Sequence, residues 1–495
     1  MNTMKFLSLL SAVLVLVVIT SCGGSSGEGL DKYVGQYLDN NSDAILVMKM
    51  DVAGIMDKSD VKNLPDVGFQ LLETFNKIDT SMALSEHVYM IASGPLDYDG
   101  MPENTALFIA VKNKEEAAKM FNEMGYFFEE TDGVNLHDED GLAIGYTDDL
   151  AIIGITGVDS LAQSFVSEVF IRAKTGTMNE FVMKNMDYEG DMIISLNLQN
   201  LYATSNTDLN QLPVQQQEKI KQLAENSYVN TALSFNDGEI VVETYLAFNE
   251  ELQKAMFFDE SGNTDVLTKL GPGEPLAAFS MNLDLDKMET FMTEVYPEGM
   301  KEMYKNLGPQ GMIFKAIGGG KLSSFVNGEF AVAITGFSEA MLFAVPQVNM
   351  YSGLGESSVD FSDLLIALLE EQEATKLGEG VFDYEGMKIK FNSSGVFITS
   401  DTNLTDDQLG NTPMKVPAGI QGFGEKPFTF YVDFTKLKSS EGAEIMADEA
   451  EIVIEELEYI YFEADNTKSK LVIKTTDGSV NVLKKSVDVA LEAIL

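Results

Sequence analysis

Side chains able to act as nucleophiles, acids, bases or metal ligands are unevenly supplied in this sequence. It contains one cysteine, Cys22, and two histidines, His87 and His137, but 78 aspartates and glutamates. If Cys22 carries a covalent modification, no thiol is left for thiolate catalysis, a zinc-thiolate site or an iron–sulfur cluster. A Ser-His-Asp hydrolase would need one of the two histidines. The sequence therefore indicates no catalytic residue, no metal site and no cofactor.

Both histidines have structural interpretations. His87 precedes the apolar run 88–91 and is expected to pack at the start of a strand. His137 lies in the acidic stretch 136–141, which we interpret as a turn. A histidine metal ligand in that turn is the alternative.

Acidic and glycine-rich stretches resemble parts of known sites without completing them. Residues 97–100 and 138–141 look like fragments of calcium loops but lack the full ligand series, which ends in Glu at position twelve. The stretch 318–321 has Leu322 where a phosphate loop requires Ser or Thr. Paired carboxylates can hydrolyse glycosides, but acids are so frequent here that such pairs carry little information. We interpret these stretches as turns and loops.

The charge balance limits the partners. The formal net charge is −45, from 33 basic and 78 acidic residues, and the acids are spread along the chain. Binding to nucleic acid requires clustered Lys and Arg that neutralise phosphates. Lying flat on an anionic bilayer also requires basic clusters. We expect no nucleic-acid partner.

The start of the chain has the anatomy of a secretory signal. Lys5 precedes an apolar run, 6–19, which is too short for a comfortable span of about 20 residues. The following Thr20-Ser21-Cys22 with Ile19 resembles the lipobox of bacterial lipoproteins. The resemblance implies cleavage after residue 21 and lipid on Cys22. Residues 1–21 are then the signal peptide, and the Gly/Ser-rich residues 22–30 a flexible tether.

A short pattern recurs four times after apolar runs. An Asp or Asn stands between two apolar residues, and another apolar residue follows at a fixed spacing; the polar positions are Asp51, Asn197, Asp284 and Asp433. We interpret each as a strand that leads into a helix, with the polar side chain capping the first helical turn. Asp284 follows Asp51 by 233 residues, and Asp433 follows Asn197 by 236. The agreement predicts two tandem duplicated halves, 31–262 and 263–495.

Hairpins and amphipathic helices complete the expected fold. Asn236-Asp237-Gly238 predicts a hairpin turn within 231–249, and 459–475 predicts another, less clearly. Apolar residues at helical spacing predict helices over 114–124, 161–173, 214–224, 286–303, 362–372, 442–457 and 480–495. We expect the last of these to dock on the second half. Short connections favour antiparallel pairing. The predicted class is α+β, each half a mainly antiparallel sheet with helices packed on one face.

Together, Cys22, its tether, the strand 43–50 with the helix after it, and the strand 277–283 resemble the Bacteroidetes lipoproteins of domain-of-unknown-function family 4836. The resemblance covers most of the mature chain. It implies an exported lipoprotein and brings no known activity, cofactor or catalytic residue; only the acylated cysteine carries over. Surface display in such bacteria often follows acids placed directly after the cysteine, and the first acid here is Glu28. We therefore expect an outer-membrane location facing the periplasm, with the cell surface as the alternative.

The predicted function is that of a lipid-anchored, non-enzymatic binding or scaffold protein of the cell envelope. Lipid on Cys22 attaches it to the membrane, and its protein or ligand partner is not identified by the sequence. Two similar halves would form a groove, a common place for ligands. The alternatives are a carboxylate- or divalent-metal-dependent hydrolase and a purely structural spacer.

Overall fold

The computed structural model describes most of the chain from residue 28 onward. The described residues are 28–39, 43–60, 77–84, 87–97, 100–139, 141–204, 212–262, 265–295, 297, 321–340, 343–355, 358–401, 404–415, 420, 422–440 and 456–487. The predicted signal peptide 1–21, Cys22, the stretch 318–320 and nearly all of the predicted helix 442–457 lie outside them. Contacts divide the chain into a first unit, 1–213, 223–249 and 478–495, and a second unit, 214–222 and 250–477.

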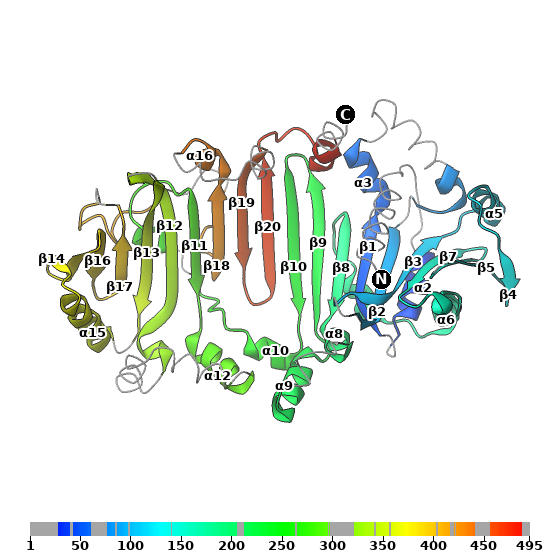
Figure 1. The fold of residues 1–495 in the computed structure, drawn as a ribbon, viewed down its shortest axis with the longest axis horizontal. Coiled ribbons are helices and arrows are strands. Elements are labelled where there is room, and N and C mark those ends of the chain that lie inside the picture. Colours follow the sequence, from blue (N-terminus) through cyan, green and yellow to red (C-terminus); the bar gives the residue numbers. More distant parts are fainter. Residues whose placement is uncertain are drawn as a thin grey trace. The chain divides into compact units, whose positions relative to one another are not determined.

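The strands of the first unit form an antiparallel sheet. They are β1 (Ala44–Asp51), β2 (His87–Leu96), β3 (Pro102–Ala110), β4 (Glu129–Thr131), β5 (Val134–Glu139), β6 (Leu142–Tyr146), β7 (Leu150–Thr156), β8 (Met192–Asn197), β9 (Tyr228–Asn236) and β10 (Glu239–Ala247). Their order in the sheet is β4-β5-β6-β7-β3-β2-β1-β8-β9-β10. β1 is therefore an inner strand, paired with β2 on one side and β8 on the other (Figure 1).

Helices cover both faces of this sheet. They are α2 (Glu28–Tyr37), α3 (Val52–Ser59), α5 (Lys114–Glu123), α6 (Ala162–Thr175), α7 (Glu180–Asn185) and α8 (Leu198–Thr204), with a 3₁₀ turn over Asp159–Leu161. The helix α9 (Val214–Ala224) precedes β9, and its residues 214–222 group with the second unit. The last three residues of the predicted tether, 28–30, belong to α2.

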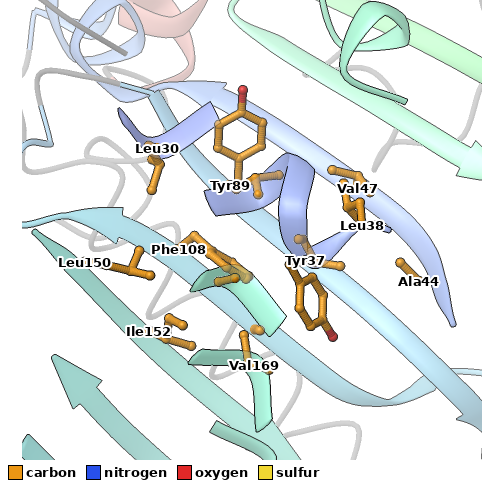
Figure 2. Close-up of a cluster of buried hydrophobic side chains, with 14 of the residues drawn as sticks. Leu30, Tyr37, Leu38, Ala44, Val47, Tyr89, Phe108, Leu150, Ile152 and Val169 are labelled. Carbon is orange, nitrogen blue, oxygen red and sulfur yellow. The ribbon is translucent and has the colours of Figure 1, made fainter. Parts of the chain in front are cut away.

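Alternate strand residues point to opposite faces and build two cores. One core joins Val47, Tyr89 and Phe108 to residues of α2, α6 and α7. Figure 2 shows side chains of α2 meeting those of β1, β2, β3 and β7 there. The other core joins Met50 and Leu107 to residues of α3 and α5. The prediction of helices on one face is thus wrong for the first unit, because its strands bury apolar residues on both sides.

The second unit is also an antiparallel sheet. Its strands are β11 (Ala277–Asn282), β12 (Val326–Ala340), β13 (Phe343–Leu354), β14 (Thr375–Gly378), β15 (Val381–Tyr384), β16 (Met387–Phe391), β17 (Gly395–Thr399), β18 (Phe428–Asp433), β19 (Leu457–Ala464) and β20 (Lys468–Thr475). Their order is β14-β15-β16-β17-β13-β12-β11-β18-β19-β20. When strands are counted from the start of each unit, this order is the same as in the first unit.

Helices also accompany the second sheet. They are α10 (Glu250–Ala255), α11 (Val266–Lys269), α12 (Leu285–Val295), α15 (Ser358–Glu371) and α16 (Phe434–Lys438), with a 3₁₀ turn over Leu322–Ser324. The core of this unit packs Val266 and Leu270 against Tyr351, Phe397 and Tyr431. Burying each large side chain of this kind contributes about 1.5–3 kcal/mol.

The four strand-to-helix junctions are confirmed. In each, the side-chain oxygen accepts a hydrogen bond from the backbone N–H three residues later, which otherwise has no partner within the helix. The contacts are Asp51 with Gly54 at 2.9 Å, Asn197 with Asn200 at 3.1 Å, Asp284 with Lys287 at 3.0 Å and Asp433 with Lys436 at 2.9 Å. The hairpins β9–β10 and β19–β20 are confirmed as well.

The C-terminal segment packs on the first unit, not on the second half as predicted. The N–H of Gly238 in the β9–β10 turn donates to the carbonyl of Val480 over 2.9 Å. Lys484 forms an ion pair with Asp60, 2.8 Å apart. These partners are polar turn and helix-end groups, which the apolar pattern of the segment did not indicate. Among the described residues, no helix is long and apolar enough to cross a membrane.

Candidate functional site

A pocket of about 310 Å³ lies in the first unit, where the end of α2 and the start of α7 meet β1, β8 and β9. We call it the carboxamide pocket, because five of its lining side chains are amides: Asn179, Asn197, Gln199, Asn200 and Asn226. Its other lining residues are Leu38, Asp39, Ala44, Ile45, Val47, Phe181, Val182, Ser195 and Tyr228. Leu38, Ala44 and Val47 are labelled in Figure 2.

The capping residue Asn197 also positions a pocket hydroxyl. Its Nδ2 donates to the phenolic oxygen of Tyr228 over 3.2 Å, while its Oδ1 caps α8. The phenol therefore accepts one hydrogen bond and keeps its own proton for another partner. Burial raises the pKa of Tyr228, so the phenol is protonated near neutral pH.

Other carboxamides fix the walls. Asn179 accepts from the N–H of Val182 at 3.2 Å, which caps α7, and donates to the carbonyl of Leu38 at 2.9 Å. Asn200 donates to the carbonyl of Ala44 at 2.8 Å. These bonds tie together segments more than a hundred residues apart, so the pocket's outline is held by directed contacts as well as by packing.

Two buried polar side chains lie side by side on neighbouring strands, and one of them, Ser195, lines the pocket. Ser195 of β8 pairs with Asn230 of β9 in the sheet, and its hydroxyl donates to Asn230 Oδ1 over 2.7 Å. Asn230 is 0% exposed. Its Nδ2 has no hydrogen-bond partner in the described part of the chain. A buried unpaired donor costs about 1–3 kcal/mol, so its retention needs an explanation.

Among the described residues that line the pocket, Asp39 has the one carboxyl group, and a cation lies beside it. Asp39 Oδ1 lies 3.3 Å from Nη2 of Arg172, which also donates to the carbonyl of Tyr37 over 3.1 Å. Arg172 is the single arginine of the sequence. The residues that line the pocket include no Lys, Arg or His. The site therefore presents neutral hydrogen-bonding groups and little net charge.

The histidines lie elsewhere. His87 begins β2, as predicted, and its Nδ1 is buried without a partner among the described residues. Burial and the nearby Lys49 lower the pKa of His87. The prediction that His137 lies in a turn is wrong. It is part of β5, its Nδ1 lies 2.8 Å from the carbonyl of Phe127, and its ring packs against Tyr126.

The acidic turns have structural roles. Asp97 accepts from the N–H of Met101 over 2.8 Å at the β2–β3 connection. Asp149, in the turn between β6 and β7, accepts from the hydroxyls of Tyr33 and Thr147. Within the described ranges, no group of three or more His, Cys, Asp or Glu side chains is placed to hold a metal ion.

Of the polar pocket residues, sequence reasoning named Asn197, and only as a cap; the apolar residues Ala44, Ile45 and Val47 lie in the predicted strand 43–50. It missed Ser195 and Asn230, although a signal was present. Both are polar residues at strand positions whose neighbours on the same face, such as Val47 and Ala232, are apolar and buried. A polar pair on an apolar face is the pattern that would have marked this site.

Comparisons with known proteins identify no family for this chain. No protein-family model matches the chain, and no curated protein matches it. Among solved structures, crystal form I of TP0453 is similar with a TM-score of 0.27 and 13% identity, over 46% of this chain and 84% of that one. Crystal form III of TP0453 gives a TM-score of 0.28 and 12% identity, over 46% and 85%. Likeness at this level carries no inference about function.

Proposed function

We propose that this chain is a lipid-anchored binding protein of the cell envelope, attached through Cys22, and that it binds a neutral ligand non-enzymatically in the carboxamide pocket. The observation that carries the proposal is the pocket's lining. Neutral donors and acceptors are held in place by hydrogen bonds, and a buried amide donor beside one of them, Ser195, lacks a partner among the described residues. Preorganised neutral groups of this kind favour binding and orientation of a ligand.

The lining offers poor means for hydrolysis. Glycosidases use two carboxyl groups on either side of the scissile bond, about 5–9.5 Å apart. The lining residues supply one, Asp39, and Arg172 pairs with it. Tyr228 is kept protonated by burial, so it acts as a donor and not as a base. The rival function, a carboxylate- or metal-dependent hydrolase, stays a prediction from the acidic composition alone.

The anchor is supported by the lipobox-like sequence that ends at Cys22. Helix α2 begins at Glu28, so residues 23–27 separate the cysteine from the first described helix. A fully extended segment of this length spans at most about 18 Å. In the proposed arrangement the protein lies in the outer membrane and faces the periplasm. Replacing Cys22 with Ala should abolish palmitate labelling and release the chain from the membrane fraction; retention in that fraction would refute the lipid anchor.

We also propose that the two units arose by tandem duplication. The support is that both have the same order of strands, with a capped helix after the corresponding inner strands β1 and β11, and β8 and β18. α3 follows β1 directly, whereas Leu283 and Asp284 separate β11 from α12. The second unit would thus carry two extra residues at this junction. The predicted groove between halves stays a prediction.

A single introduced thiol tests the binding proposal. Because lipid would block Cys22, Gln199→Cys gives the full-length chain one reactive cysteine, at an exposed position on the pocket wall. An environment-sensitive fluorophore there should respond to a protein-free extract of the cell envelope. The control is Phe127→Cys, labelled in the same way at a side chain that is 77% exposed and does not line the pocket. Equal responses at both positions, or none at residue 199, would refute the proposal.

A further inference from the structure

The side chains of Ser195 and Asn230 stand at sheet positions where the second unit has two tyrosines. Ser195 stands two residues before the cap Asn197, and Tyr431 stands two residues before the cap Asp433. In the sheet, Ser195 pairs with Asn230, and Tyr431 pairs with Tyr461. The alignment is supported by the residues opposite the caps, which are Tyr228 and Tyr459.

The two units fill these matching positions with side chains of different size. Tyr431 is 2% exposed and Tyr461 8%, and their hydroxyls donate to Asp433 and Glu463, each over 2.9 Å. At the matching positions the first unit has two smaller side chains, one of them with an amide nitrogen that has no partner among the described residues. A tyrosine ring fills much more volume than a serine hydroxymethyl group, so the small pair leaves space in front of the sheet.

The polar groups at this space suit a ligand that both donates and accepts hydrogen bonds. Tyr228 lines the pocket and has a phenolic proton to give. Ser195 donates its proton to Asn230, so its oxygen lone pairs are left to accept. A hydroxyl group is donor and acceptor at once, and an array of hydroxyls matches such a mixed set.

The charge of the site argues against ions. An anion would find no Lys, Arg or His among the described lining residues, and it would approach a chain of net charge −45. A cation would find the carboxylate of Asp39 already paired with Arg172. A neutral ligand avoids both penalties.

Phe181 adds an apolar platform. Its side chain is 51% exposed, and its ring meets the ring of Tyr228 edge to face, with centroids 5.4 Å apart and an interplanar angle of 61°. A pyranose ring has an apolar face of C–H groups and a rim of hydroxyls, so one side can lie on an aromatic ring while the rim meets amides and hydroxyls. A peptide strand fits less well. β1 and β8 are inner strands paired on both sides, so the sheet offers no free backbone edge here.

We propose that the carboxamide pocket binds a neutral sugar residue, with its C–H face against Phe181 and its hydroxyls directed to Ser195 and Tyr228. The proposal rests on the binding function proposed above and names the class of its ligand. The cavity, about 310 Å³, lies at the small end of the range of pockets that hold small molecules.

The test measures saturation-transfer NMR and affinity on the full-length protein. The probes are the methyl glycosides of glucose, galactose, mannose and N-acetylglucosamine, with acetyl-Ala-Ala-Ala-amide as a neutral peptide. At least one glycoside is expected to bind. Phe181→Ala should weaken that binding about tenfold, because it removes the aromatic platform. Ser195→Tyr, which introduces the side chain that the second unit has at residue 431, should abolish it by filling the pocket. Phe127→Ala, at an exposed ring outside the pocket, should bind as the unaltered protein does.

The outcomes separate the two proposals. If the peptide binds and Ser195→Tyr blocks it, the sugar inference is overturned and the binding function stands. If no glycoside binds while the fluorophore at residue 199 responds to envelope extract, the sugar inference is again overturned and the binding function again stands. If neither glycoside nor peptide binds and the fluorophore is silent, both proposals fail. Phe181 lies on the surface, so its variant remains informative even if Ser195→Tyr does not fold. Unchanged glycoside affinity in Phe181→Ala would overturn the proposed geometry.

Discussion

The pair Ser195–Asn230 allows a stability prediction that separates a structural role from a ligand-binding one. Ser195 is 2% exposed and supplies the one hydrogen bond that the structure gives to the side chain of Asn230 within the described residues. Ser195→Ala removes this donor and leaves both polar atoms of Asn230 buried and unpaired. Leaving a buried polar group without its partner costs about 1–3 kcal/mol. We therefore expect the variant to lose about that much free energy of unfolding in the first unit.

The double variant Ser195→Ala/Asn230→Leu should recover most of this loss. It removes both polar partners and places an apolar side chain of similar size on an apolar face, and such a replacement can be nearly neutral. We expect its free energy of unfolding to lie within about 1 kcal/mol of the unaltered protein. The polar pair would then contribute little net stability, which fits a role in binding.

The assay is urea unfolding followed by the fluorophore at residue 199, which reports on the first unit. This local probe is needed because a chain of two units need not unfold in one step. The matched control is Ser234→Ala, a partly exposed serine on the same strand as Asn230, which is expected to change stability by less than about 0.5 kcal/mol. If Ser195→Ala is as stable as the control, or if the double variant is less stable than the single one, the reasoning about this pair is refuted.

Three further predictions concern caps, pH and metals. Asp51→Ala should lower the free energy of unfolding by about 0.5–2 kcal/mol and Asp51→Asn far less, because asparagine can still cap α3; equal losses in urea unfolding would contradict the capping role. Burial would raise the pKa of Asp465, but hydrogen bonds from Lys426 and Thr467 outweigh it and lower the pKa to about 2. Asp465 therefore stabilises the fold above its unfolded pKa of about 3.9, and this contribution is lost as the pH falls toward about 2. In Asp465→Asn, the melting temperature should therefore depend less on pH between these two values. An unchanged pH dependence would count against this role of Asp465. Titration with calcium, magnesium or zinc should leave the melting temperature unchanged, whereas a saturable rise would favour the rival metal-dependent hydrolase.

The local features of the fold were predictable from the sequence. Alternating apolar residues located the strands, and Asp51, Asn197, Asp284 and Asp433 were identified as caps because a cap depends on a few adjacent residues. The turn at 236–238 was predictable for the same reason. One available signal was underused. The run 106–111 is apolar throughout, which is typical of a strand buried on both faces, and it would have predicted helices on both sides of the first sheet.

Features that depend on distant contacts were not predictable. His137 was expected in a turn because of its acidic neighbours, but 138 and 139 are exposed residues at the end of a strand whose partners are β4 and β6. The pocket itself depends on sheet register, which brings Ser195 next to Asn230, and on Asn179, which bonds to Leu38 across 141 positions of the sequence. A pattern in a single sequence does not specify either pairing.

Methyl NMR of the full-length chain tests the central claim most directly. With Ile, Leu and Val methyls labelled, addition of the glycoside that binds best, or of protein-free envelope extract, should shift the signals of Ile45, Val47 and Val182, which line the carboxamide pocket. Methyls of Val166 and Ile152, in the core of the same unit, serve as the internal control and should move little. Shifts confined to methyl groups that line the pocket, those of Leu38 included, are the predicted result. Absence of shifts at these residues, or shifts spread equally through the core, would contradict the assignment of a ligand site to this pocket.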